Sequence, residues 1–150
     1  MDTKRKKRGD RGFTLIELMV VIVIIGILAA YIAPKLINRT EDAKITAAKA
    51  QIRSFETGLK LFRLDCGFYP STEQGLQALV SQPSTGRIPE RYKQGGYLET
   101  SAIPNDPWGN EYIYESPGQH GFDYEIRSLG ADGVDGGENE SRDIESWNIE

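Results

Sequence analysis

The sequence predicts an α+β fold in which one long N-terminal helix packs on a small antiparallel β-sheet. Residues 13–33 form a nearly continuous apolar run, and residues 45–62 carry apolar side chains at helical spacing. Short β-prone runs separated by turn residues follow between residues 112 and 126. Because no internal repeat is visible, we expect one head domain over residues 37–150, behind a single N-terminal helix.

Charge is distributed unevenly along the chain. Residues 1–12 hold six Lys or Arg and two acidic residues, so they carry +4 although the whole chain carries −4. A basic segment in front of an apolar run stays on the cytoplasmic side of a membrane, and the acidic remainder is expected to cross. An acidic main body also argues against binding to nucleic acid.

The apolar run over residues 13–33 is long enough to span a membrane. As a helix it would measure ~31 Å, which matches one bilayer core, so we expect contact with membrane lipid. It is too long for the apolar part of a secretory signal peptide, and no small-x-small cleavage site ends it. A charge inside such a run costs ~3 kcal/mol, so Glu17 is expected to have a partner.

Pro34 follows this run. A proline removes one backbone donor and clashes with the preceding turn, so we expect a kink or a local opening between residues 26 and 34. The alternative is that Pro34 only marks the membrane exit.

The helix is expected to continue beyond the membrane. Six apolar residues recur at spacings of three and four: Ile45, Ala48, Ile52, Phe55, Leu59 and Phe62. Gly67 suits the position after a helix end, and Pro70 follows it, so the helix should end at Cys66–Gly67. Ser71 and Gln74 then have the spacing of a capping box, which predicts a short helix.

Two β-prone runs, residues 112–114 and 122–126, flank a turn over 117–121 and predict an antiparallel hairpin. The only cysteine, Cys66, excludes an intrachain disulfide and is interpreted as a small apolar residue. The only histidine, His120, is interpreted as a solvated turn residue.

Residues 128–144 form an acidic, glycine-rich segment. It contains five acidic residues before its end: Asp132, Asp135, Glu138, Glu140 and Asp143. Calcium takes six to eight oxygen ligands, and glycines let backbone carbonyls turn toward an ion. The segment is not an EF-hand, because Val134 and Gly136 occupy the third and fifth ligand positions. From the residues alone, a calcium site and a solvated loop both remain open.

The string Arg11-Gly12-Phe13-Thr14-Leu15-Ile16-Glu17-Leu18 resembles the N-terminal signal of type IV prepilins and of type II secretion pseudopilins. The resemblance implies a pilin-like fold, cleavage between Gly12 and Phe13 by a membrane prepilin peptidase, and methylation of the new Phe13 amine. Glu17 of one subunit would then neutralise the Phe13 amine of its neighbour in a filament. Filaments of this kind contain a melted helical stretch, which is consistent with Pro34.

Two further stretches, residues 65–79 and 104–112, resemble the major pseudopilin family of type II secretion, also called general secretion pathway protein G. This resemblance implies a structural subunit that polymerises with itself into a short periplasmic filament and promotes export of folded proteins across the outer membrane. Minor pseudopilins and an inner-membrane assembly platform would be its partners. The resemblance also implies one calcium ion, and the matching positions are the carbonyls of Leu129 and Val134, the side chains of Asp132 and Asp143, and Asn139.

The expected organisation is a leader peptide over 1–12, a transmembrane and filament-core helix over 13–36, and a periplasmic head over 37–150. Two alternatives are a type IV pilus pilin, which usually has a C-terminal disulfide, and a membrane-anchored calcium-binding module. Catalysis has no support, because one histidine, no Cys-x-x-Cys pair and no helical His pair leave no recognisable catalytic or zinc set.

Overall fold

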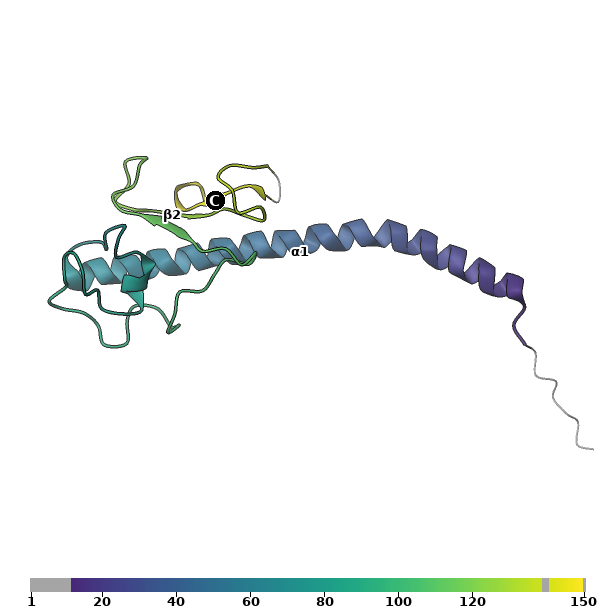
Figure 1. Ribbon diagram of the computed structural model, residues 1–150, viewed down its shortest axis with the longest axis horizontal. Coiled ribbons are helices and arrows are strands. Elements are labelled where there is room, and N and C mark those ends of the chain that lie inside the picture. Colours follow the sequence, from purple (N-terminus) through teal and green to yellow (C-terminus); the bar gives the residue numbers. More distant parts are fainter. Residues whose placement is uncertain (1–11, 139–140, 150) are drawn as a thin grey trace, which may run out of the picture. The chain divides into compact units, whose positions relative to one another are not determined.

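The computed structural model describes residues 12–138 and 141–149, and it describes the side chains of all of these except residues 33–38. The chain divides into two compact units, Met1–Arg39 and Thr40–Glu150, which are treated separately below. Nearly all of the expected leader, residues 1–12, lies outside the described residues. Helix α1, Leu15–Cys66, begins in the first unit and ends in the second (Figure 1).

The first unit is built from the apolar part of α1. Its stretch Leu15–Ile32 is long and apolar enough to cross a membrane, and none of it is buried by the rest of the chain. The backbone is helical through residues 26–34, so the local opening expected there is not seen. The missing N–H of Pro34 costs one helical hydrogen bond, and the single chain accommodates this loss without leaving the helix. The Pro34 side chain itself lies outside the described residues, so its role stays a prediction.

The second unit has its core on one face of α1. Ala48, Ile52, Phe55, Leu59 and Phe62 are completely buried, and Ile45 packs at the edge of this cluster. The Phe55 ring meets Tyr112 edge-on at 5.1 Å between centroids. The predicted amphipathic stripe is therefore confirmed as the spine of the head.

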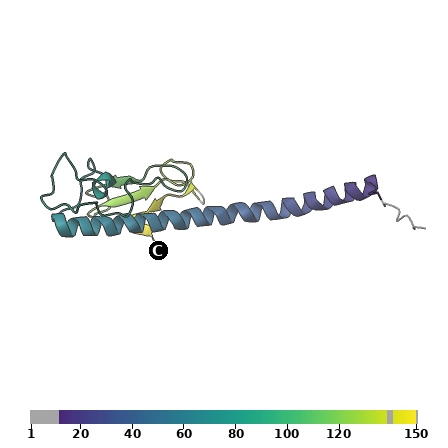
Figure 2. The same ribbon diagram turned by 90° about the horizontal axis from the view of Figure 1, so that it is seen from below.

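A three-stranded antiparallel sheet covers this stripe. Its strands are β1, Ile113–Glu115, β2, Glu125–Ser128, and β3, Ile144–Glu145, in the order β1-β2-β3. Ile113 pairs with Arg127, and Ser128 pairs with Ile144. Figures 1 and 2 both show the sheet beside the part of α1 that belongs to the head. The hairpin was predicted, whereas β3 was not.

The end of α1 and the segment after it follow the sequence signals. α1 ends at Cys66, and the Gly67 amide donates to the Arg63 carbonyl at 2.8 Å with φ of +81° at Gly67. The Ser71 amide donates to Gln74 Oε1 at 3.1 Å, and the Gln74 amide reaches Ser71 Oγ at 3.4 Å, as in a capping box. The short 3-10 helix η1, Leu76–Leu79, follows, and another, η3, Ser146–Asn148, lies near the C-terminus.

Candidate functional site

The N-terminus of α1 holds three of the residues expected to function in processing and assembly. Gly12 and Phe13 precede the helix, and the Phe13 side chain is 88% exposed. Thr14 occupies the cap position and Glu17 the third helical position. The Thr14 amide and hydroxyl both donate to Glu17 Oε2 at 2.9 Å, and the Glu17 amide donates to Thr14 Oγ1 at 3.3 Å. These reciprocal bonds form a capping box.

Sequence reasoning missed this partner of Glu17. The signal was present, because Thr-x-x-Glu before an apolar run is the capping-box pattern. In a single chain, Glu17 therefore has a local role in addition to any role between subunits. Both oxygens of the box belong to residues that lie after the expected cleavage site at Gly12.

The acidic loop, residues 128–144, contains all of the expected calcium ligands, and the structure describes each of them except Asn139. Asp132 is exposed, and its Oδ1 accepts a hydrogen bond from the Val134 amide at 3.1 Å. Asp143 directly precedes β3, and its Oδ2 accepts a hydrogen bond from the Gly136 amide at 3.0 Å. Leu129, near the start of the loop, is half-buried. Asn139 lies outside the described residues, and so does Glu140.

The second oxygen of Asp143 fits a bound cation. Within the described part of the chain, Oδ1 of Asp143 is buried and has no hydrogen-bond partner. Burial, together with the neighbouring Asp135 carboxylate, raises the pKa of Asp143. Asp135 itself pairs with Arg127, at 2.5 Å between Nη1 and Oδ1. A buried carboxylate oxygen that no donor satisfies is an arrangement that a cation would stabilise.

Carboxylates alone do not make a metal centre here. Among the described residues, no three Asp, Glu, His or Cys side chains converge. A calcium ion at this loop would therefore need backbone carbonyls as well, which is what the family resemblance expects of Leu129 and Val134.

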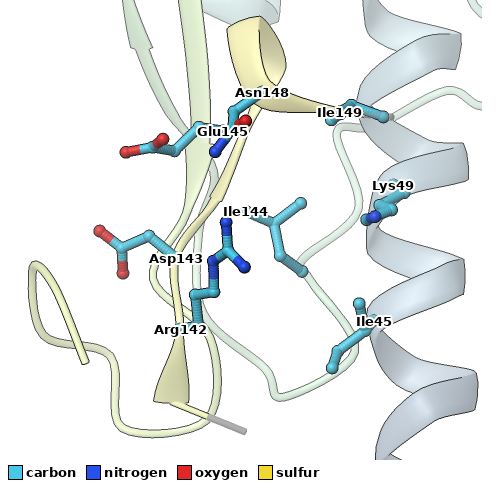
Figure 3. A pocket seen from close by; sticks show the side chains of 8 residues that line it. All are labelled: Ile45, Lys49, Arg142, Asp143, Ile144, Glu145, Asn148 and Ile149. Carbon is cyan, nitrogen blue, oxygen red and sulfur yellow. The ribbon is translucent and has the colours of Figure 1, made fainter. Parts of the chain in front are cut away.

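Asp143 is one of the residues that line a groove beside β3, but its carboxylate is not directed toward α1 (Figure 3). This groove lies between the C-terminal segment and α1 and includes Ile45, Lys49, Ile144 and Ile149 in its lining. Figure 3 shows the Ile144 side chain directed toward α1, whereas the carboxylate of Asp143 points away from α1. The side chains of Asp143 and Ile144 thus point to opposite sides of the backbone, and the Asp143 carboxylate contacts the acidic loop through its Oδ2 and the Gly136 amide.

His120 has partners that the sequence did not indicate. Its amide donates to Glu125 Oε1 at 2.6 Å, and its Nδ1 lies 3.0 Å from the same oxygen. The imidazole stacks on Trp147 at 4.7 Å between ring centroids. The interpretation as a simple solvated turn residue was incomplete, because both partners come from other elements of the fold. Cys66 is half-buried beside the core, and its Sγ lies 3.0 Å from the Arg91 carbonyl oxygen.

An exposed apolar helix with a capped, glutamate-bearing N-terminus, followed by an α+β head, defines the chain as pilin-like. The model for the prokaryotic N-terminal methylation motif matches residues 7–33, and the model for type II secretion system protein G matches residues 35–147. The chain therefore belongs to the type II secretion system protein G family.

Curated relatives and a solved structure agree with this assignment. The type II secretion system core protein G of Vibrio cholerae is 46% identical over 97% of both chains. The protein of the same description from Pseudomonas aeruginosa is 46% identical over 95% of this chain and 98% of its own. The crystal structure of the major pseudopilin of enterohaemorrhagic Escherichia coli covers 77% of this chain and 96% of its own, with a TM-score of 0.65 and 39% identity.

These findings define the role of the chain as a subunit of the type II secretion pseudopilus. The family is one of structural subunits, which points away from catalysis. The methylation motif and the apolar helix fit a single-pass anchor in the inner membrane.

Proposed function

We propose that the chain is the major subunit of this pseudopilus, made as a precursor and cleaved between Gly12 and Phe13 before assembly. The observation that carries the proposal is the match of both the N-terminal motif and the head to the family, over nearly the full length. The basic leader would remain cytoplasmic and the head periplasmic, as the charge asymmetry of the sequence favours. A prepilin peptidase would remove the leader, and the new Phe13 amine would be methylated.

Assembly would use the exposed apolar helix. Leu15–Ile32 presents apolar side chains that the single chain leaves uncovered, so lipid would cover them before assembly and neighbouring copies afterwards. The Phe13 amine of one subunit would neutralise Glu17 of the next, because neither charge is stable alone in an apolar filament core. Minor pseudopilins and an inner-membrane assembly platform would be the other partners, and the filament would promote export of folded proteins across the outer membrane.

Calcium would order the acidic loop. The carbonyls of Leu129 and Val134 and the carboxylates of Asp132 and Asp143 would hold the ion, with Asn139 as a further oxygen ligand. When bound, calcium would supply positive charge to a loop that crowds acidic groups. The buried Oδ1 of Asp143, which has no hydrogen-bond partner among the described residues, supports this assignment.

Processing and filament formation test the main proposal together. Intact-mass measurement of the membrane-extracted protein should show a chain that begins at methylated Phe13, and replacing Gly12 with a bulky residue should block cleavage. Overproduction with an assembly platform should yield filaments visible by electron microscopy and support secretion of a reporter. A mature chain with another N-terminus would refute the processing step. Adhesive surface pili without secretion would instead indicate a type IV pilin.

A further inference from the structure

A turn outside the acidic loop contacts that loop through one side chain. The turn spans residues 104–110, and Asn110 is its last residue. The Asn110 Nδ2 donates to the Gly130 carbonyl oxygen at 3.0 Å. A Cβ added to Gly133 would lie 3.3 Å from Asn110 Oδ1, so the amide packs directly against the loop backbone. Asn110 therefore contacts the loop between Leu129 and Val134, the two residues whose carbonyls are proposed as ligands.

Asp106 fixes the position of Asn110. The Asp106 side chain is almost completely buried, and its Oδ1 accepts the Asn110 amide at 2.8 Å. The Asp106 amide in turn donates to the Asn110 carbonyl oxygen at 2.8 Å. The other carboxylate oxygen accepts from Ser128 Oγ, at the end of β2, at 2.6 Å. The turn is thereby attached to the sheet at the point where the loop begins.

The same turn is attached to α1. The Trp108 indole Nε1 donates to Glu41 Oε2 at 2.9 Å, and Glu41 also pairs with Lys44. Asn110 thus belongs to a turn with contacts to the helix, the sheet and the acidic loop. Because these contacts already restrict the turn, Asn110 loses little further conformational freedom when it binds the acidic loop.

We propose that Asn110 is a positioning residue for calcium: its amide holds the backbone of residues 129–134 in the conformation that binds the ion. This inference rests on the calcium site proposed above. Four glycines with positive φ lie in the loop, at positions 130, 133, 136 and 137. Ordering a glycine-rich backbone costs much conformational entropy. If Asn110 orders the loop before calcium binds, the ion has to offset less of this entropy cost. Removing a residue that orients a metal ligand typically weakens metal binding by about 10- to 100-fold.

Asn110→Ala tests this role, and Asn105→Ala is the matched control. Asn105 lies in the same turn, but its Nδ2 donates to the Gly109 carbonyl at 2.9 Å and not to the loop. Asn110 is only partly buried and its backbone bonds to Asp106 survive the change, so the head should remain folded. The full chain, purified in detergent, is titrated with calcium. Amide exchange of residues 129–137 and the melting temperature are measured in chelator.

We expect Asn110→Ala to raise the calcium Kd about tenfold and to accelerate exchange of residues 129–137 in chelator. The melting temperature of Asn110→Ala in chelator should stay close to that of the wild type. Asn105→Ala should change neither the calcium Kd, nor the amide exchange of residues 129–137, nor the melting temperature. Asn110→Asp keeps the size of the side chain but removes the donor, so it should also accelerate exchange.

Unchanged Kd and exchange in Asn110→Ala would overturn the inference, and so would equal effects in the Asn105 variant. A melting temperature that falls while loop exchange and Kd stay as in the wild type would also overturn it, because the role would then be structural. If the wild type itself does not bind calcium, the calcium site is wrong and this inference falls with it. If the wild type and Asn110→Ala bind calcium equally well, the positioning role of Asn110 is refuted but the calcium site is not.

Discussion

Glu17 illustrates how one side chain can serve two purposes. In the single chain it accepts two hydrogen bonds from Thr14 and helps to begin α1. In a filament it is proposed to neutralise the Phe13 amine of a neighbour. Glu17→Ala removes both the helix cap and the charge, so it cannot separate the two functions.

Glu17→Gln separates the cap from the charge. Glutamine can occupy the third helical position of a capping box, but it cannot neutralise an amine. We expect normal cleavage at Gly12 and filament yield as low as in Glu17→Ala, measured by electron microscopy of sheared filaments. Thr14→Ala, which removes the cap and keeps the charge, should retain most of the yield. Wild-type filament yield from Glu17→Gln would contradict the pairing between subunits.

At the scale of single elements, α1 depends on one buried stripe in the head. Leu59 is completely buried in this stripe, whereas Leu64 is 79% exposed on the same helix. Leu59→Ala should lower the free energy of unfolding by about 2–5 kcal/mol, because it removes buried apolar volume and leaves a cavity. Leu64→Ala should change it by less than about 0.5 kcal/mol. Urea denaturation of both variants provides the measurement, and similar losses would show that the stripe is not the core.

The turn between β1 and β2 depends on a buried carboxylate. Burial alone would raise the pKa of Glu125, but the hydrogen bonds from the His120 amide and ring outweigh it, and the pKa is lowered. A lowered carboxyl pKa adds stability that is present above the ordinary Glu pKa of about 4.3 and is lost as the pH falls through the lowered value.

We therefore expect the wild-type head to lose stability on acidification from about pH 5 downward. Glu125→Gln should be less stable than the wild type at pH 7, and the difference should shrink as the pH falls through this range. Melting temperatures measured between pH 3 and pH 7 test this, with Glu115→Gln as a control at the half-exposed end of β1. A constant difference between Glu125→Gln and the wild type across the range would contradict the prediction.

For the whole molecule, calcium is expected to couple the acidic loop to the stability of the head. A ligand that binds only the native state stabilises it by RT ln(1 + [L]/Kd), about 2.7 kcal/mol at a hundredfold excess over Kd. Calcium should raise the melting temperature, and magnesium should raise it much less because it requires a tighter octahedral site.

Asp143→Asn has a distinctive expected result. It removes the charge of a carboxylate whose buried Oδ1 has no hydrogen-bond partner in the described part of the chain, so the melting temperature in chelator should not fall. The increase caused by calcium should nevertheless largely disappear. Asp123→Asn, on an exposed pair with Arg63, should keep the full calcium response and serves as the control. An unchanged calcium response in Asp143→Asn would remove this residue from the ligand set.

Local patterns in the sequence determined the apolar helix, the buried stripe from Ala48 to Phe62, the helix end at Cys66 and the capping box at Ser71. Each depends on residues within a few positions of one another, where helical periodicity and glycine geometry act directly. Family-like motifs added the expected cleavage site and the calcium ligands, which no local geometry could supply.

Only the tertiary structure decided the contacts between distant residues. β3 has two residues, too few for a period-two pattern, and it exists because β2 offers an edge to pair with. His120 meets Trp147 from another element, and Asn110 reaches Gly130 twenty positions away. These contacts form because burial of the common core brings the segments together. The spacing of residues along the chain does not indicate which distant segments will come into contact.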